Sequence, residues 1–232
     1  MTVWFTSDVH FGHRKAAEHR GFSDVDEHDA TLIDNWTATV APDDVVWVLG
    51  DIAASSPTYA LAVLSTLPGT KHLILGNHEQ AHPMHRDAHK HLRKYLDVFE
   101  SVAQSARRRI SCTIDGEETN REVLMSHFPY FRDRGPVRHS QWRLPYEKRW
   151  LLHGHTHGRE QLTAATSEIH VGVDAWDLTP VALSTLSDII SKEETQRAAL
   201  VKLRAAMILP DAHRFLYGRE ASAALGDRAA QS

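Results

Sequence analysis

The sequence lacks most features that mark secreted, membrane or nucleic-acid-binding proteins. Its 232 residues contain one cysteine, Cys112, so no disulfide can form within the chain, which fits a reducing cytosol. The first residues lack the basic and apolar regions of a signal peptide, and no apolar run approaches the roughly 20 residues of a membrane-spanning helix. The formal net charge of -4 gives no general attraction to polyanions. We therefore expect a cytoplasmic protein with no membrane and no stable nucleic-acid partner.

Length and composition fit one globular domain. The 42% hydrophobic and 24% charged content is ordinary, and the length suffices for a substantial core. We find neither internal repeats nor an interdomain linker. Residues 1–232 are therefore expected to form a single domain, in which residues 187–232 make a C-terminal helical extension with a frayed tail. Ser191 and Glu194 resemble a capping box that opens this helix, and Pro210 is expected to end it.

Histidine, in contrast, is abundant, with 17 residues, and several follow apolar runs. The most informative stretch is residues 71–79, KHLILGNHE. Its short apolar run predicts a buried strand that ends at Gly76, with Asn77 and His78 at the mouth. Adjacent residues leaving a strand point in different directions. We therefore expect Asn77 to bind a metal through its amide oxygen and His78 to act on a leaving group.

Other apolar runs also end in side chains that bind metals well. These are residues 3–6 before Asp8 and His10, 45–49 before Asp51, and 123–126 before His127. Two residues apart in extended backbone, Asp8 and His10 would face the same side. Each feature has a common alternative, since an Asp-x-His pair is often a surface pair and Gly-Asp is a routine turn.

The segment 153–158, HGHTHG, holds three alternating histidines. His155 and His157 are the expected ligands, whereas His153 suits a buried, hydrogen-bonded position within a strand. The alternative is a histidine tract that binds metal adventitiously. Further on, Asp174 could orient a ligand histidine from behind, although a turn or cap is the more common role.

Residues 128–149 lack clear periodicity and combine arginines with aromatics, which suits a loop that binds phosphate and a stacking base. The alternative is a solubilising surface loop. His13 could also reach the substrate, although a solvent-facing or outer position is more usual for such a histidine. The candidate substrate-binding residues are Arg132, Arg138, His139, Trp142 and His13.

The remaining periodic segments predict core elements. Helices are expected over residues 23–40, 57–67 and 81–96, and a half-buried strand over 110–114 contains Cys112 as a core residue. The third helix carries four histidines, which we assign to a solvated face; a metal pair of His85 and His89 is the alternative. Strand, helix and strand around Asp51 and Asn77 predict a βαβ unit, with ligands beyond the carboxyl ends of the strands.

Taken together, the candidate ligands exceed what one tetrahedral ion can use, but they suit two ions that share a carboxylate. Two cations about 3.5–4 Å apart can clamp both oxygens of an in-line phosphoryl displacement. The seven candidates are Asp8, His10, Asp51, Asn77, His127, His155 and His157.

With these residues assembled, the sequence resembles the calcineurin-like metallophosphoesterase superfamily, whose pattern runs D-x-H, G-D, G-N-H-[DE], H and G-H-x-H. All five blocks occur here in that order between residues 8 and 157. The opening SDVHFGH and the late HVGVDAWD are similar to a group of small bacterial and phage phosphoesterases within that superfamily.

The resemblance implies an α/β (α+β) fold, a four-layer αββα sandwich with two mixed β-sheets and a dimetal site at the loop end. Asp8, His10, Asp51 and His157 would hold one metal, and Asp51, Asn77, His127 and His155 the other, with Asp51 bridging. A metal-bridging hydroxide would attack phosphorus in line, and His78 would protonate the leaving oxygen. Glu79 replaces the Asp of many relatives, and either residue could pair with a histidine. We see no capping domain, which favours an open cleft.

We expect hydrolysis of phosphodiesters in small nucleotides, 2′,3′-cyclic ones included. A phosphomonoesterase or phosphoprotein phosphatase is the second hypothesis and single-strand nuclease action the third. A non-catalytic metal-binding scaffold is the alternative from another class. The cofactors would be two divalent ions among Mn, Fe, Zn, Ni and Co, with Mn favoured, because the donors are nitrogen and oxygen without thiolate. The oligomeric state is not predicted.

Overall fold

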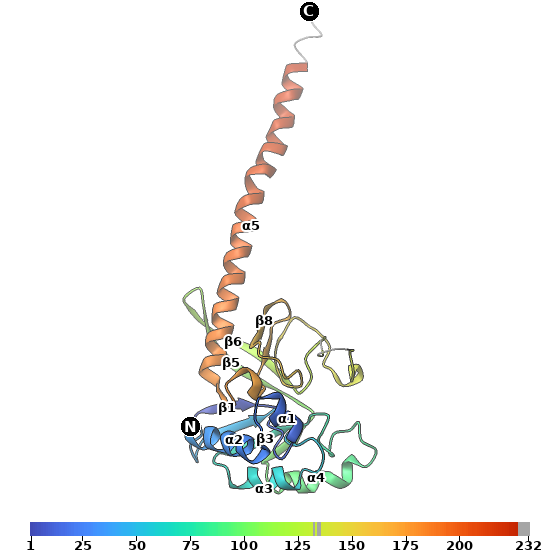
Figure 1. Ribbon diagram of the computed structural model, residues 1–232. Coiled ribbons are helices and arrows are strands. Elements are labelled where there is room, and N and C mark those ends of the chain that lie inside the picture. Colours follow the sequence, from blue (N-terminus) through green and yellow to red (C-terminus); the bar gives the residue numbers. More distant parts are fainter. Residues whose placement is uncertain (132, 134–135, 227–232) are drawn as a thin grey trace, which may run out of the picture.

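Two five-stranded sheets pack face to face in the computed structural model (Figure 1), which describes residues 1–131, 133 and 136–226, with side chains up to residue 206. The strand order is β10-β1-β2-β3-β4 in the first sheet and β5-β6-β7-β9-β8 in the second. Each sheet contains both parallel and antiparallel pairs. The fold class expected from the sequence, an α+β sandwich of two mixed sheets, is confirmed.

The first sheet places three loops at one edge. Its parallel strands are β1 (Val3–Thr6), β2 (Val45–Val48), β3 (Thr70–Ile74) and β4 (Ser101–Ala103), and β10 (Val181–Ala182) pairs antiparallel with β1. Helix α3 (Thr58–Thr66) connects β2 to β3, so the predicted βαβ unit is present. Because β1, β2 and β3 run parallel, the residues that follow them meet at the same edge.

The second sheet brings its own loops to that edge. Strands β5 (Ser105–Ile114) and β6 (Glu117–Ser126) form an antiparallel hairpin, and β7 (Trp150–His153) and β9 (Glu168–His170) continue parallel to β6. The short β8 (Leu162–Thr163) pairs antiparallel with β9. A bridge between Ser7 and Gly172 joins the segments that follow β1 and β9, so the two sheets meet there.

Two apolar cores explain the layers. One lies between the first sheet and helices α2 (Val25–Thr39), α3 and α4 (Ala88–Leu96), and it includes Trp36, Leu64 and Tyr95. The other lies between the sheets and includes Phe5 and Met125. In β2, Val46 and Val48 belong to the first core, while Val45 and Trp47 pack against the second. This strand is therefore covered on both faces, as its continuous apolar run predicts.

The short elements and the last helix complete the chain. Helix α1 (Arg14–His19) follows the β1 loop, and 3-10 turns occupy Ser140–Trp142, Ala164–Thr166 and Val173–Ala175. Helix α5 (Leu183–Gly226) extends away from the sheets (Figure 1). Near its start it contributes Leu186 and Ile190 to the core between the sheets. No helix in the described part of the chain is both long and apolar enough to cross a bilayer.

Several helix boundaries differ from the sequence expectations. The helix expected from residue 23 begins at Val25, and the side chain of Asp24 caps it by accepting from the Asp26 N–H. Helix α5 already begins at Leu183, where core contacts of Leu186 and Ile190 stabilise its first turns. Ser191 and Glu194 therefore lie inside the helix and form no capping box. The helix also continues past Pro210, because a proline removes one backbone hydrogen bond and can kink a helix without ending it.

The predicted helix over residues 81–96 is shorter than expected, because α4 begins only at Ala88. His82 precedes it and is buried, with its ring edge-on to Phe128 and Trp142, so its assignment to a solvated face is wrong. His85 also lies outside the helix and contacts the Asn77 carbonyl oxygen at 3.0 Å. Cys112 is buried in the core between the sheets, as predicted.

Asp44 ties the start of β1 to the start of β2 and provides a test of the fold. Its carboxylate accepts from the Thr2 N–H, the Trp4 indole N–H and the Ala41 N–H. These hydrogen bonds hold the pKa of Asp44 below its ordinary value of 3.8, and the hydrogen bond from Thr2 has the largest effect. The stabilisation is therefore present above pH 3.8 and is lost as the pH falls through the lower folded-state pKa.

We expect Asp44→Asn to lower the Tm at pH 7, because a neutral amide replaces an ionised acceptor of three hydrogen bonds. The difference from wild type should shrink as the pH falls below about 4. Thermal unfolding followed by circular dichroism between pH 2 and pH 7 measures both. A Tm difference that stays constant over this range would contradict the assignment.

Candidate metal centre

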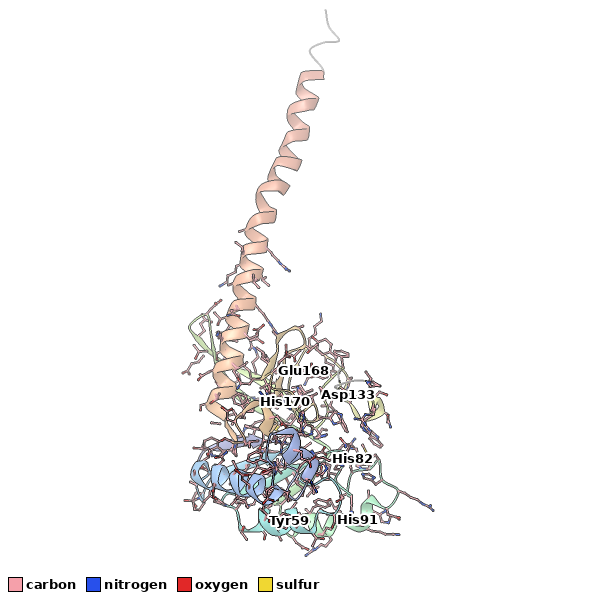
Figure 2. The ribbon with its side chains drawn as sticks, in the orientation of Figure 1. Tyr59, His82, His91, Asp133, Glu168 and His170 are labelled. Atoms are coloured by element: carbon pink, nitrogen blue, oxygen red, sulfur yellow. The ribbon has the colours of Figure 1, made fainter. Side chains whose placement is uncertain are left out.

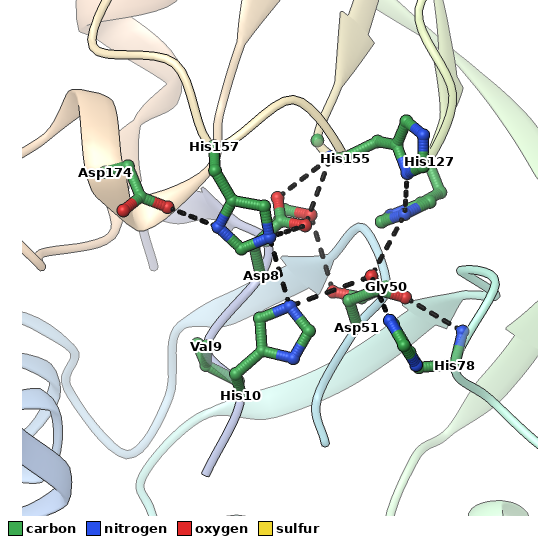
Figure 3. Close-up of polar contacts among 12 residues, drawn as sticks. Asp8, Val9, His10, Gly50, Asp51, His78, His127, His155, His157 and Asp174 are labelled. Carbon is green, nitrogen blue, oxygen red and sulfur yellow. Dashed lines mark hydrogen bonds and ion pairs between the residues drawn. The ribbon is translucent and has the colours of Figure 1, made fainter. Parts of the chain in front are cut away.

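The structure gathers the seven predicted ligands at the edge where the two sheets meet, and Figure 3 labels all of them except Asn77. They follow β1, β2 and β3 in the first sheet and β6 and β7 in the second. Six of them form two groups in which the candidate ligand atoms all lie within 4.8 Å of one another. The first group is Asp8, His10 and His157; the second is Asp51, His127 and His155.

In the first group, the imidazoles of His10 and His157 lie nearly parallel, with their Nε2 atoms 3.2 Å apart. The Nε2 atom of His157 is also 3.8 Å from Asp8 Oδ1. Two ring nitrogens and a carboxylate oxygen therefore face one small volume, which is the donor arrangement of a divalent cation site.

In the second group, His127 Nε2 is the central atom. It lies 3.4 Å from Asp51 Oδ2, 3.2 Å from His155 Nδ1 and 3.2 Å from the Asn77 side-chain oxygen. The His127 Nδ1–H donates to the Leu49 carbonyl at 2.7 Å, which leaves Nε2 directed at the group. The amide oxygen of Asn77 thus joins this group as a fourth donor.

Asp51 connects the two groups. Its Oδ2 atom lies 3.4 Å from His127 Nε2 and 3.7 Å from His10 Nε2, so one carboxylate oxygen is within reach of both. The carboxylate of Asp8 makes a second connection, because both of its oxygens accept from the backbone N–H of His155. Together these side chains provide the nitrogen and oxygen donors for two cations that share one carboxylate, and no thiolate is among the donors.

Five of the seven candidates have left-handed backbone conformations. The φ angles are 59° at Asp8, 49° at His10, 56° at Asp51, 72° at His155 and 49° at His157. Such angles are uncommon outside glycine and cost about 1–3 kcal/mol each where the surroundings impose them. The expectation that Asp8 and His10 share one side of an extended backbone is therefore wrong, since both sit in a tight loop. Backbone hydrogen bonds from Asp8 to Gly50 and from His10 to Asp51 hold this loop against the next.

The charges of the two groups suit cations. Burial lowers the pKa of His10 well below its usual value and lowers the pKa of His155 to about 3. Both rings are therefore neutral at pH 7, and each offers a lone pair to a cation. Burial opposes ionisation of Asp51, but His127 holds its pKa far below the usual range. Conversely, Asp51 outweighs burial and raises the pKa of His127 to about 10. The proton on His127 balances a charge that a divalent cation would balance in its place.

Glu79 has a different role from the one expected. Its buried carboxylate accepts from the backbone N–H groups of Asp51, Ile52 and Gly76 and so fastens the loop after β2 to the loop after β3. Burial, together with the charge of Asp51, raises its pKa to about 7. Glu79 was expected to be able to pair with a histidine, whereas its hydrogen bonds go to the backbone that positions Asp51.

His78 lies at the rim of the centre. Its side chain is 39% exposed, and its Nε2 atom is 3.9 Å from Asp51 Oδ2. The Nδ1 atom is 3.0 Å from the Ala54 carbonyl oxygen, a contact in which Nδ1–H donates. The backbone N–H of His78 donates to Asp51 Oδ1, which fixes the start of this segment. The ring therefore presents Nε2 to the mouth of the centre.

An open cavity of about 310 Å³ lies over the centre. It includes His13 and Arg138, two of the predicted substrate-binding residues, together with Lys15 and His19, which were not predicted as site residues. Neither lies in a distinguishing motif, and the sequence signal of Lys15 was only its positive charge near the first loop. The full lining is His10, His13, Lys15, Ala16, His19, His78, Asp133, Arg138, His155, Thr156 and His157.

The other predicted substrate-binding residues lie elsewhere. Trp142 packs its ring edge-on against His82, with centroids 5.1 Å apart, and His139 packs beside Phe128. Neither is part of the lining of this cavity. Arg132 lies outside the described residues. His153 is buried within β7, with Nδ1 2.8 Å from the Gly154 carbonyl oxygen, as the sequence predicted.

Comparison with known proteins agrees with this fold and these groups. The family model "Calcineurin-like phosphoesterase" matches residues 1–159. The chain is 49% identical to the Gene 66 protein of Mycobacterium phage L5 over 182 residues, which cover 75% of this chain and 87% of that protein. The Gene 66 protein of Mycobacterium phage D29 is 47% identical over 77% of this chain and 92% of its own length. The chain therefore belongs to the calcineurin-like phosphoesterase family and is a metal-dependent phosphoester hydrolase.

Two more distantly similar proteins also match most of this chain. An uncharacterized protein of Methanocaldococcus jannaschii is 25% identical over 84% of this chain and 94% of that protein. The crystal structure of a protein of unknown function from Aquifex aeolicus superposes with a TM-score of 0.57 at 21% identity, covering 80% of this chain and 97% of that one. This last similarity shows a shared fold.

Gly154 provides a test of how closely the loops approach each other. A Cβ at this position would lie 2.5 Å from Asp8 Oδ2 and still closer to Ser7 Oγ, so Asp8 would have to move. We expect Gly154→Ala to destabilise the protein by about 1–3 kcal/mol and to weaken Mn²⁺ binding. Thermal unfolding and calorimetric titration with Mn²⁺ measure these effects.

Gly158→Ala is the matched control in the same loop, because its Cβ would meet its nearest neighbour at an ordinary 3.6 Å. It should resemble wild type in both measurements. Equal behaviour of the two variants would refute the close approach at Gly154.

Proposed function

We propose that this phosphoesterase hydrolyses small phosphodiesters, with nucleotides as the substrate class and 2′,3′-cyclic nucleotides among them. The observation that carries the proposal is the open, cation-lined cavity over the two ligand groups. Its lining includes Lys15 and His19 of α1, which follows β1 of the first sheet, and Arg138, from the segment between β6 and β7 of the second sheet. Its volume of about 310 Å³ is at the lower end of the usual range for small-molecule sites, which suits a mononucleotide better than a long strand.

Two divalent cations would be held by the two groups, with Asp51 as the shared carboxylate. Asp8, His10 and His157 would bind one ion, and Asn77, His127 and His155 would bind the other. Nitrogen and oxygen donors admit Mn, Fe, Zn, Ni or Co, and we favour Mn. When bound, such a pair stabilises charge that develops on a phosphoryl group and lowers the pKa of water.

His78 is the proposed general acid. Its Nδ1–H donates to the Ala54 carbonyl, so the ring is oriented, and its exposed Nε2 faces the cavity near Asp51. An alkoxide such as a ribose oxygen is a poor leaving group unless it receives a proton. With both ring nitrogens protonated, His78 would supply that proton from Nε2, while Lys15 and Arg138 in the cavity lining would attract the anionic substrate.

A phosphomonoesterase is the second candidate, and the same cationic residues favour it. A monoester carries close to two negative charges at neutral pH, which Lys15 and Arg138 would bind more strongly than the single charge of a diester. The lining, however, also contains a carboxylate, Asp133, which offsets part of the positive charge of Lys15 and Arg138.

A substrate panel separates these candidates. The Mn²⁺-loaded protein should turn over 2′,3′-cyclic nucleotides and other small diesters with a higher kcat/KM than the corresponding monoesters or a phosphopeptide. Steady-state assays of phosphate or nucleoside release measure the ratio. Turnover confined to monoesters would replace the diesterase proposal with the second candidate.

His78→Ala tests whether the protein is a catalyst. We expect kcat to fall by about 10²–10⁴-fold, the usual contribution of a general acid, while Mn²⁺ stoichiometry stays as in wild type. His89→Ala is the control, because His89 is exposed on α4. A wild type inactive on the whole panel with Mn²⁺, Ni²⁺, Co²⁺ and Zn²⁺ alike would favour a non-catalytic scaffold instead.

A further inference from the structure

His157 is held from behind by a buried acid and a buried arginine. Its Nδ1 lies 3.0 Å from Asp174 Oδ2, on the opposite side of the ring from the first ligand group, as Figure 3 shows. Both oxygens of Asp174 accept from Arg20, at 3.0 and 2.9 Å. The side chains of Asp174 and Arg20 are only 7% and 4% exposed. Arg20 also donates to the backbone carbonyls of Asp8 and Val9, so one guanidinium holds both the acid and the first loop.

His155 has an equivalent arrangement from a different part of the chain. Its Nε2 lies 2.9 Å from Asp133 Oδ1, and Asp133 in turn accepts from Arg143 at 2.5 Å. The side chains of Arg143 and Asp133 are 5% and 3% exposed. The backbone N–H of Arg138 donates to the other oxygen of Asp133, and Arg143 also donates to the Pro129 carbonyl. In Figure 2, Asp133 lies on the side of the second sheet and His82 on the side of the first.

The two arrangements leave opposite nitrogens for the metal groups. In His157 the acid binds Nδ1, which leaves Nε2 facing His10, whereas in His155 the acid binds Nε2, which leaves Nδ1 facing His127. A neutral imidazole that donates from one nitrogen presents the lone pair of the other. The partner of the outer nitrogen therefore decides which tautomer each ring adopts and how it is oriented.

Each acid also forms an ion pair with its arginine, Asp174 with Arg20 and Asp133 with Arg143. An ionised carboxylate can only accept a hydrogen bond, so the ring nitrogen that faces it has to carry the proton.

We propose that Asp133 and Asp174, each clamped by a buried arginine, are positioning residues that select the metal-binding nitrogen of His155 and His157, one for each metal group. The proposal rests on the proposed function in that the two groups must bind cations. It goes beyond that function because it assigns one acid, with its arginine, to each of the two metal groups. Loss of one acid should therefore weaken one ion and spare the other.

Calorimetric titration with Mn²⁺ tests this separation. Asp174→Asn should weaken one of two Mn²⁺ sites by about 10–100-fold, the usual effect of losing such a partner, because an amide can donate as well as accept and no longer fixes the ring. Asp133→Asn should weaken the other site to a similar extent. Asp177→Asn, an exposed acid near Asp174, is the matched control and should bind as wild type does.

Nuclear magnetic resonance of the zinc-loaded protein detects the ring N–H protons directly. Their signals would not change in the expected way if the two acids only stabilised the fold. Wild type should show two downfield ring N–H protons, on Nδ1 of His157 and on Nε2 of His155, and each variant should lose one. Absence of these resonances from wild type would overturn the proposal even where a variant does not fold.

The outcomes also separate this proposal from the function on which it rests. Wild type that binds two Mn²⁺ ions, with both variants unchanged, would overturn the positioning role alone. Wild type that binds no Mn²⁺ or Zn²⁺ would overturn the proposed function and this proposal together. Equal weakening of both sites by either variant would overturn the assignment of one acid to one ion.

Discussion

The arrangement of the site depends on one carboxylate held between two groups of imidazoles. Asp51 reaches both His10 and His127 because its backbone turns into a left-handed conformation directly after a buried strand. Glu79 holds this turn by accepting from the backbone of Asp51 and Ile52, and β2 below it is packed on both faces. The buried strand and the carboxylate of Glu79 thus impose a conformation that the loop alone would rarely adopt.

Gathering so many polar groups in one place requires that charge be balanced locally. Burial alone would drive Asp8 and Asp51 toward their neutral forms, and it raises the pKa of Asp8. His127 and the guanidinium groups of Arg20 and Arg143 supply the opposing positive charge around the centre. Divalent cations would complete this balance, which is why the unusual backbone and the buried acids make sense as parts of one metal centre.

Much of the centre could be predicted because its ligands follow strands, and parallel strands end at a common edge. Asp8, Asp51, Asn77, His127 and the 153–158 histidines all carry this local signal. Among the supporting residues, only Asp174 was considered from the sequence as one that could orient a ligand histidine, and the others carry no such local signal. Arg20 and Asp174 are 154 positions apart, and Asp133 lies in a segment whose pattern suggested only a binding loop. Likewise, the limits of α4 and α5 depend on packing against distant strands, and the backbone contacts of Glu79 depend on two loops meeting. Neither can be read from neighbouring residues.

The central claim, that Asp51 is shared by two cations, is tested most directly by titrating Mn²⁺ into wild type, Asp51→Asn and Asp8→Asn with calorimetry, with metal content checked by elemental analysis. We expect two ions per chain in wild type, weaker binding of both in Asp51→Asn, and weaker binding of one in Asp8→Asn. Loss of a single ion in Asp51→Asn, with the other bound as in wild type, would contradict it.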